Sequence, residues 1–235
     1  MKIKSGRSVL STNERQAALN RRRLDALGLV AVNLLASPGA GKTSLLTRLL
    51  RSIPSNLSLG VIEGDVAGRL DTDRILAMGF PATQINTGGG CHLDADMIAR
   101  AVRALDIEGP GYLFIENIGN LICPAEFRLG ERLRIVVASV PEGDDKPVKY
   151  PGVFASASAV VLNKIDLLSH VDFNMDFFLA GVRTVNPEAP VFNVSCRTGE
   201  GVDALTAWLL KTKPRRPARA CPEGRPGKKP RKVKR

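Results

Sequence analysis

A glycine-rich turn carrying a lysine and a threonine lies near the start of the chain. It reads Ala36-Ser37-Pro38-Gly39-Ala40-Gly41-Lys42-Thr43, between an aliphatic run and a helical leucine pattern. Such a turn binds phosphate, because backbone N–H groups and a helix N-terminus point at the phosphate oxygens. We predict that Ser37–Thr43 holds phosphates, that Lys42 reaches the β- and γ-phosphates and that Thr43 binds Mg²⁺. Ala36 replaces the usual first glycine and would be strained if that position required φ > 0. An ordinary strand–helix turn is the weaker alternative.

A second motif, Asn163-Lys164-Ile165-Asp166, follows a predicted strand. It matches the guanine-reading step of GTPases. The Asp166 carboxylate can accept hydrogen bonds from the N1–H and 2-amino groups of guanine, a pair that adenine does not offer. We expect Lys164 to lie along the base and Asn163 to brace the loop. A second base loop is predicted at 195–199, where the Cys196 backbone N–H would meet the guanine O6. GTP and GDP are therefore the predicted ligands, and a plain turn is the alternative.

Two carboxylates stand at the ends of predicted strands. Asp65 closes Glu63-Gly64-Asp65, and Glu116 begins Glu116-Asn117-Ile118-Gly119-Asn120. Ligands of open α/β sheets bind beyond the carboxyl ends of the strands, where carboxylates can hold Mg²⁺. We predict that Asp65 and Glu116 sense the metal and the γ-phosphate and, with Lys42 and Thr43, form the catalytic set. Solvated or capping carboxylates are the alternative. With no assignable water-positioning glutamine or arginine finger, hydrolysis should be slow, on the order of 10⁻⁴–10⁻² s⁻¹.

A cysteine and a histidine follow three glycines in Gly88-Gly89-Gly90-Cys91-His92, and Cys123 comes after the Glu116–Asn120 segment. Adjacent side chains on a strand point to opposite faces, but a glycine turn can bring Cys91 and His92 together. Thiolate and imidazole ligands suit Ni²⁺ or Zn²⁺. Three ligands are few for a closed zinc site, and a symmetric dimer could complete the coordination. On chemistry alone, a buried cysteine and a helix-capping histidine fit equally well.

Alternating strands and helices must position these residues. Aliphatic runs predict buried parallel strands, and leucine-rich periodic segments predict helices between them. The fold class expected is α/β, a P-loop NTPase with a mostly parallel sheet and helices on both faces. The expected strands are 29–36, 57–62, 112–116, 135–139, 159–162 and 191–194, and the expected helices are 13–27, 42–50, 71–78, 93–105, 173–185 and 202–210.

Composition limits the function classes. The 235 residues are 44% hydrophobic, which suits one α/β domain, and no apolar run of about 18 residues predicts a membrane span. Met1–Leu10 lacks the apolar core of a secretory signal, and the four scattered cysteines favour a cytoplasmic, reducing setting over a disulfide framework. We predict an N-terminal arm and helix (1–28), a GTPase domain with the metal site (29–211) and a disordered basic tail (212–235).

The net positive charge of the chain comes from the tail. Of 34 basic and 23 acidic residues, twelve basic and one acidic lie in Lys211–Arg235, so this segment carries the whole net charge of +11. Clustered basic residues bind phosphate backbones, but the tail has no aromatic residue on which bases could stack. A nucleic-acid binder is therefore the less favoured interpretation, and a solvated extension is expected.

Taken together, these motifs make the chain resemble the hydrogenase nickel-incorporation GTPase family, HypB. The resemblance runs from about Val30 to Leu210. It rests on Ser37–Thr43, Glu63–Asp65 with Asp71–Ile75, Gln84–Gly88, Cys91–Ala95, Glu116–Pro124 and Asn163–Asp166. It implies metal ligands at Cys91, His92 and Cys123, at a homodimer interface promoted by GTP and metal. It also implies nickel insertion into hydrogenase, with other hydrogenase maturation proteins and the hydrogenase large subunit as partners.

Two features depart from the family pattern. Many members of the family resembled carry a histidine-rich stretch or a cysteine-rich motif near the N-terminus that binds or stores nickel. Met1–Leu27 contains no cysteine or histidine, so nickel storage there is not expected. The basic tail has no counterpart in the family pattern. A urease-type nickel-insertion GTPase is an alternative, but its metal motif is Cys-Pro-His, whereas Cys91 and His92 are adjacent. A metal-binding module without significant turnover is a second alternative. The favoured mechanism is that hydrolysis shifts Cys123 relative to Cys91 and His92, coupling nucleotide state to metal affinity by about 1–3 kcal/mol.

Overall fold

Seven parallel strands form the single sheet of the described structure. The computed structural model describes residues 6–65 and 68–214, and its strands lie in the order β3-β2-β4-β1-β5-β6-β7. Their bounds are β1 Leu29–Ala36, β2 Ser58–Asp65, β3 Ala82–Asn86, β4 Gly111–Glu116, β5 Leu133–Ser139, β6 Ala159–Asn163 and β7 Val191–Val194. The central strands are aliphatic and buried on both faces, as expected of a parallel sheet. The predicted α/β class is confirmed.

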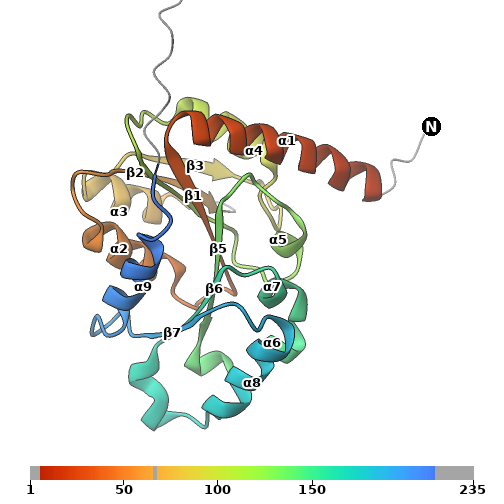
Figure 1. The fold of residues 1–235 in the computed structure, drawn as a ribbon, viewed down its shortest axis with the longest axis vertical. Helices are drawn as coiled ribbons and strands as arrows, with labels where there is room; N and C mark the ends of the chain where they lie inside the picture. The colour runs from red at the N-terminus through yellow and green to blue at the C-terminus, as the bar shows by residue number, and fades with distance from the viewer. Residues whose placement is uncertain (1–5, 66–67, 215–235) are drawn as a thin grey trace, which may run out of the picture.

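Helices cover both faces of the sheet (Figure 1). Their bounds are α1 Gly6–Ala26, α2 Lys42–Ser52, α3 Leu70–Ala77, α4 Ala95–Ala104, α5 Cys123–Glu126, α6 Lys146–Lys149, α7 Pro151–Ala155, α8 Met175–Val185 and α9 Val202–Leu209, with 3₁₀ turns at Val140–Glu142 and Ile165–His170. Alternate residues of β1 face opposite sides. Val32 and Leu34 pack with α2 and α9, whereas Leu29 and Ala31 pack with α1 and α4.

The sequence-predicted elements differ from the observed ones mainly at their ends. The first helix was predicted over 13–27 but begins at Gly6, and the helix predicted over 93–105 spans Ala95–Ala104. The edge strand β3 and the short helices α5, α6 and α7 were not predicted. None of the described helices combines the length and the apolar character that a bilayer crossing requires. Residues 1–5 of the predicted arm and 215–235 of the predicted tail lie outside the described part.

Parallel strands bring the functional loops to one edge of the sheet. The phosphate loop leaves β1, Asp65 ends β2, Glu116 ends β4, Asn163 ends β6 and the 195–199 loop leaves β7. Because every strand points the same way, these carboxyl ends meet at the same edge. The motifs found along the sequence are therefore neighbours in space.

Candidate nucleotide and metal site

The phosphate loop has the backbone shape that its glycines permit. Gly39 and Gly41 have φ values of 81° and 97°, in the region that residues with a Cβ rarely adopt. A Cβ on Gly41 would also collide with the Asn163 side-chain amide. Ala36 lies in β1, and Lys164 is the one non-glycine residue with positive φ in the described ranges. The strain considered for Ala36 is therefore absent.

The predicted base-reading loops are joined to the phosphate loop by side-chain hydrogen bonds. Asn163 Nδ2 donates to the Ala40 carbonyl at 2.9 Å, and Asn163 Oδ1 accepts from the Cys196 backbone N–H at 3.2 Å. Lys164 Nζ donates to the Gly39 carbonyl at 2.7 Å. The structure thus brings the three predicted segments together, with Asn163 bracing them.

Asp166 is held in place from the second base loop. Its Oδ1 accepts a hydrogen bond from the Ser195 hydroxyl at 2.6 Å, while Arg197 lies 3.9 Å from the other carboxylate oxygen. The carboxylate is 16% exposed, so it is reachable by a ligand but restricted in orientation. An oriented carboxylate suits the N1–H and 2-amino groups of guanine. The Cys196 N–H, the predicted donor to the guanine O6, donates to Asn163 in this structure.

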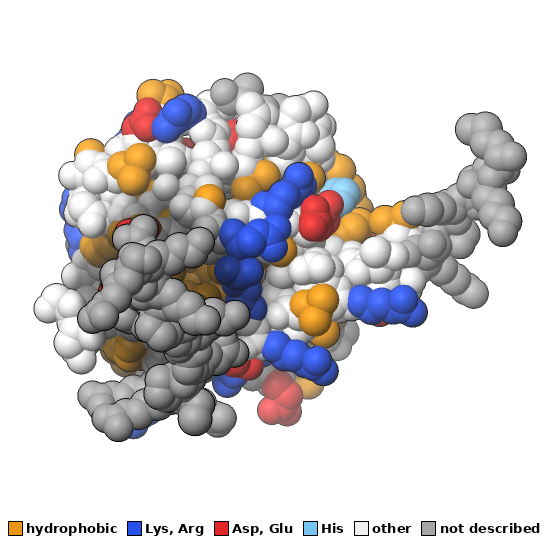
Figure 2. Space-filling view, turned by 90° about the horizontal axis from the view of Figure 1, so that it is seen from above, with side chains coloured by type: hydrophobic (Ala, Val, Ile, Leu, Met, Phe, Trp, Pro, Cys, Tyr) orange, Lys and Arg blue, Asp and Glu red, His pale blue; other side chains and the backbone are white. Residues whose placement is uncertain are grey.

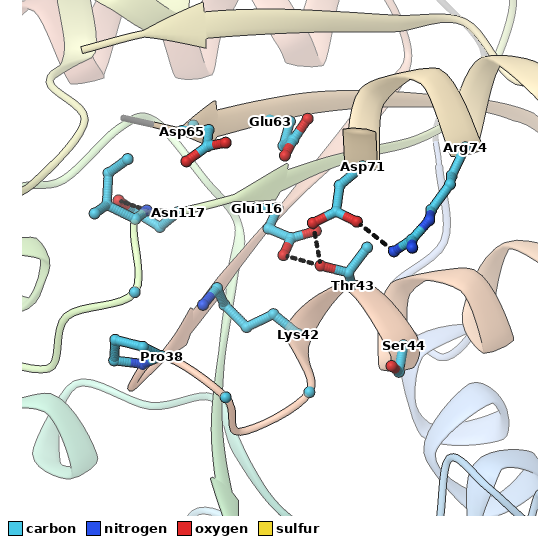
Figure 3. A pocket seen from close by; sticks show the side chains of 15 residues that line it. Pro38, Lys42, Thr43, Ser44, Glu63, Asp65, Asp71, Arg74, Glu116 and Asn117 are labelled. Atoms are coloured by element: carbon cyan, nitrogen blue, oxygen red, sulfur yellow. Dashed lines mark hydrogen bonds and ion pairs between the residues drawn. The ribbon is translucent and has the colours of Figure 1, made fainter. Parts of the chain in front are cut away.

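An acidic cluster surrounds the start of α2 (Figure 3). The Thr43 hydroxyl lies 2.7 Å from Glu116 Oε1 and 3.3 Å from Asp71 Oδ2. Burial raises the pKa of Glu116 to about 7, although the Thr43 hydroxyl and the Lys42 ammonium oppose the shift. Burial also lowers the pKa of Lys42, against the attraction of Glu116. Such a cluster needs a counter-cation to hold its carboxylates ionised together.

The donor set fits a divalent cation. Glu116 Oε2 is buried and has no hydrogen-bond partner among the described residues, beside the Thr43 hydroxyl and the Asp71 carboxylate. Hydroxyl and carboxylate oxygens are the ligands that Mg²⁺ takes in nucleotide sites. Asp65 lines the same pocket, where its Oδ2 accepts from the Gly68 N–H at 2.9 Å. All four predicted catalytic residues, Lys42, Thr43, Asp65 and Glu116, line this one pocket.

Sequence inspection missed other residues of the pocket wall, which include Glu63, Asp71, Arg74 and Asn117. Glu63 is buried, accepts from the Thr72 hydroxyl and has a pKa raised chiefly by burial. Asp71 lies in the first turn of α3 and forms an ion pair with Arg74 at 2.9 Å. The acidic first turn of a helix following Asp65 was a usable signal for Asp71. Asn117 lies in the Glu116–Pro124 segment that carries the family resemblance, but no role was predicted for it.

The three predicted metal ligands come together on the surface. Ligand atoms of Cys91, His92 and Cys123 all lie within 4.8 Å of one another, and Cys91 Sγ is 3.6 Å from His92 Nδ1. Gly88 and Gly89 have φ values of 58° and 100°, which lets the loop turn back as predicted. The neighbouring Cys123 thiol raises the pKa of Cys91, so a bound cation must displace protons from the pair. The His92 ring stacks on Phe127 at 3.9 Å, a contact that the sequence did not reveal.

Comparison with known proteins agrees with this combination of sites. Residues 30–193 match the family model described as CobW/HypB/UreG, nucleotide-binding domain. The hydrogenase maturation factor HypB of Rhizobium leguminosarum bv. viciae is 50% identical over 218 residues, covering 93% of this chain and 73% of that protein. This chain belongs to the HypB family of hydrogenase maturation factors. The family prediction made from the motifs is confirmed.

Two solved HypB structures have the same fold. HypB from Helicobacter pylori in complex with nickel has a TM-score of 0.80 at 37% identity, covering 85% of this chain and 94% of that chain. HypB from Archaeoglobus fulgidus has a TM-score of 0.78 at 37% identity, covering 86% and 98%. The nucleotide-binding P-loop architecture of this HypB family member is therefore shared along nearly the whole solved chains.

Helix α1 supports the segments that carry the candidate metal ligands of this HypB family member. Asn13 Oδ1 accepts from the Ala95 N–H at 2.8 Å, and its Nδ2 donates to the Arg128 carbonyl at 2.8 Å. Asn20 Nδ2 donates to the carbonyls of Ala95 at 2.7 Å and Leu129 at 2.9 Å. Both asparagines are buried. They tie Ala95, which follows His92, to residues 128–129, which follow Cys123, so α1 joins the chain just beyond the two ligand-bearing segments.

Proposed function

We propose that this HypB family member is a GTP-hydrolysing metallochaperone that helps insert nickel into hydrogenase during its maturation. The observation that carries the proposal is that one short segment serves both sites. Glu116 faces the phosphate pocket, and Cys123 closes the thiol–imidazole cluster. A change at the phosphates can thus reach a metal ligand through a few residues of chain.

Each residue of the phosphate pocket has a proposed role. The Ser37–Thr43 backbone and Lys42 bind the phosphates, while Thr43, Glu116 and Asp71 or Asp65 hold Mg²⁺. When bound, Mg²⁺ supplies positive charge that stabilises the charge developing on the phosphate oxygens. Asp65 and Glu116 orient the attacking water and respond to loss of the γ-phosphate. Asn163, Lys164, Asp166 and the Cys196 N–H select guanine.

The Cys91, His92 and Cys123 cluster binds the transferred metal ion as cargo. Its thiolate and imidazole donors accept either Ni²⁺ or Zn²⁺. Nickel is favoured because the Helicobacter pylori relative carries it in its solved structure. One chain supplies only three ligands, each exposed or half-buried, so a bound ion would have a coordination position open to another group. We assign that open side to a second copy of the chain in a dimer promoted by GTP and metal, and then to the acceptor.

The proposed partners are other hydrogenase maturation proteins and the hydrogenase large subunit, to which the chain would deliver metal. The similarity to hydrogenase maturation factors supports this proposal. An ion held at the surface by three ligands can pass between proteins by stepwise ligand exchange. A deeply buried, four-ligand site would not allow that.

A metal titration tests the proposal. Wild type and Cys91→Ala are titrated with Ni²⁺ and with Zn²⁺ in GDP and in a non-hydrolysable GTP analogue, and molecular mass is measured in solution. We expect wild type to bind nickel, to dimerise with the analogue and to lose both properties in Cys91→Ala. Wild type that binds neither ion above background would contradict the proposal.

A GTP turnover assay separates the proposed enzyme from a metal-binding module. We expect slow release of phosphate, on the order of 10⁻⁴–10⁻² s⁻¹, that requires Mg²⁺ and is lost in Lys42→Ala. Turnover in wild type no faster than in Lys42→Ala would show that the chain binds nucleotide without hydrolysing it.

A further inference from the structure

Two buried polar side chains lie side by side on the α1–α4 face of the sheet. Asn33 of β1 and Arg134 of β5 are register partners on neighbouring strands, and both are almost fully buried. The other residues of this face, such as Ala31, Leu35 and Val136, are aliphatic. Burying polar groups in such a layer is costly unless they hold something. Each of the two supports a different ligand-bearing segment.

Arg134 anchors the segment that carries Cys123. Its guanidinium donates to the carbonyls of Ala125 at 2.8 Å and Phe127 at 2.6 Å, and it forms a buried ion pair with Glu131. These contacts fix the end of α5 and the backbone of Phe127, whose ring stacks on His92, to the sheet. None of these residues lines the phosphate pocket. This anchor therefore joins the Cys123 segment to β5 and not to the phosphate loop.

Asn33 supports the other segment through Asn117. Asn117 Nδ2 donates to Asn33 Oδ1 at 3.3 Å, and Asn117 Oδ1 accepts from the N–H groups of Ile118 at 2.9 Å and Leu93 at 3.4 Å. Leu93 directly follows His92. Asn117 itself directly follows Glu116 and lines the phosphate pocket. One side chain thus links the pocket wall to the loop of Cys91 and His92.

The Asn117–Asn120 turn makes two further contacts, one with the phosphate loop and one with the Cys91 loop. A Cβ on Gly119 would lie 3.1 Å from the Pro38 nitrogen, so the Asn117–Asn120 turn packs directly on the phosphate loop. Asn120 Nδ2 donates to the Cys91 carbonyl at 3.3 Å. The bonds through Leu93 and Asn120 are long for hydrogen bonds, and the Asn33 amide nitrogen has no partner among the described residues. The hydrogen bonds from Asn117 to Leu93 and from Asn120 to Cys91 can therefore shorten or break when the turn moves.

We propose that Asn117 is the positioning residue that transmits the state of the phosphate pocket to the Cys91–His92 loop, while Arg134 holds the Cys123 segment still. The proposal rests on the proposed function. When the turn beside Glu116 shifts with the γ-phosphate, Asn117 moves on Asn33 and carries the Leu93 N–H with it. Cys91 and His92 then move against a fixed Cys123, which reverses the sequence-based hypothesis that Cys123 is the ligand that shifts. The affinity for Ni²⁺ or Zn²⁺ changes as a result.

The test compares nickel affinities in two nucleotide states for variants of the full chain. Wild type should bind Ni²⁺ about 5- to 150-fold differently in GDP and in the non-hydrolysable GTP analogue, the range usual for coupled sites. In Asn117→Ala this ratio should fall to within about two-fold. Arg134→Lys is the matched control: it should weaken nickel binding in both states and keep the ratio. Asn33→Ala, which leaves the pocket lining intact, should lower the ratio partly.

Amide hydrogen exchange provides a readout that a merely structural role would not move. The Leu93 N–H of wild type should differ in protection between the two nucleotide states, and the difference should vanish in Asn33→Ala. The Met97 N–H, bonded to Asp94 at 2.8 Å, is the internal control. Thermal unfolding in GDP checks that each variant folds.

The outcomes separate the two proposals. Wild type that binds no nickel overturns the proposed function. Wild type that binds nickel with equal affinity in both states overturns the transmission through Asn117 and leaves the metal site standing. A full wild-type ratio in a folded Asn117→Ala variant, or a Leu93 amide indifferent to nucleotide in wild type, also overturns it.

Discussion

The choice of base depends on the Asp166 carboxylate, which Ser195 orients. Asp166→Asn exchanges an acceptor for a donor facing the guanine 2-amino group. We expect GTP affinity to fall about 100-fold, because a hydrogen bond to a charged group contributes about 1.5–3 kcal/mol. Xanthosine triphosphate, whose C2 oxygen can accept from the new amide, should bind the variant better than the wild type. Calorimetric titration of both proteins with both nucleotides measures this, and unchanged GTP affinity would remove Asp166 from the base site.

The Cys196 thiol should react slowly with alkylating reagents in the folded protein. Burial raises its pKa from 9.0 to about 11, so the neutral thiol dominates at pH 8.5. Since alkylation follows the thiolate, its rate should be about 100-fold lower than for the same cysteine in urea. Between about pH 9 and pH 11 the Cys196 thiol loses its proton in the unfolded chain but keeps it in the folded protein. Its contribution to the free energy of unfolding therefore decreases as the pH rises through this range. Peptide mapping after timed iodoacetamide treatment measures the rates; equal rates would contradict the prediction.

The roles of the site residues were predictable where a side chain acts through its type and spacing. The phosphate loop, Asn163–Asp166 and the Cys91, His92 and Cys123 set could be named from the sequence, and the structure brings each set together. Asn117, Phe127 and Arg134 could not, because their significance lies in contacts with distant segments. An asparagine after a strand has no spacing that marks it as a link.

Among the elements, the aliphatic strands were predicted most closely, because a strand buried on both faces has few alternatives. The edge strand β3, with the sequence ATQIN, was missed since it is polar and only half-buried. Helices α5, α6 and α7 span four or five residues and each carries a proline at its start. Too short for a periodic pattern, they depend on packing for their stability.

Helix α1 shows why a weak apolar stripe can still mark a buried face. Its buried positions are Asn13, Ala17, Asn20 and Leu24, so half of the stripe is polar. The asparagines bond carbonyl and N–H groups from residues 95 and 128–129, and Asn20 Oδ1 also accepts from Gln16 Nε2 at 3.0 Å. The local sequence pattern does not indicate hydrogen-bond partners that lie so far along the chain. For this reason the helix was predicted to begin at residue 13, seven residues after its observed start.

The α1 contacts predict a stability effect. Asn20→Ala removes a buried donor shared by the Ala95 and Leu129 carbonyls, which belong to the segments that follow His92 and Cys123. We expect a loss of about 1–3 kcal/mol in the free energy of unfolding, the cost of leaving buried polar groups unsatisfied, together with weaker nickel binding. Urea denaturation of the metal-free variant measures the first effect. Leu19→Ser, at an exposed position of the same helix, is the control and should change little.

At the scale of the whole molecule, the net charge is concentrated at one end of the sequence. On the face shown in Figure 2, basic side chains gather in a short band with acidic and hydrophobic side chains beside them. The net charge of +11 comes from the segment beginning at Lys211. The described chain ends near the start of β4, where the Tyr112 hydroxyl donates to the Thr212 carbonyl at 2.9 Å. That is the edge opposite the nucleotide and metal loops.

Truncation after Pro214 is therefore predicted to leave the unfolding transition, GDP affinity and nickel affinity unchanged. Binding to a polyanion such as heparin should be lost, and in the full chain it should weaken steeply with salt, because it depends on counterion release. Binding at two salt concentrations, before and after truncation, measures this. A truncated protein that lost GDP affinity would show that the segment contributes to the folded core.

Because the seven strands of the sheet run in the same direction, the candidate site lies at the carboxyl ends of the strands, and the opposite end of the sheet is free for attachment. The connections 54–57 and 106–110 lead into the starts of β2 and β4 and contain none of the residues assigned to nucleotide or metal. A fluorescent dye or a surface tether attached there would leave the loops of the other end free to meet a second copy or an acceptor protein. Ion transfer could then be watched in single immobilised molecules.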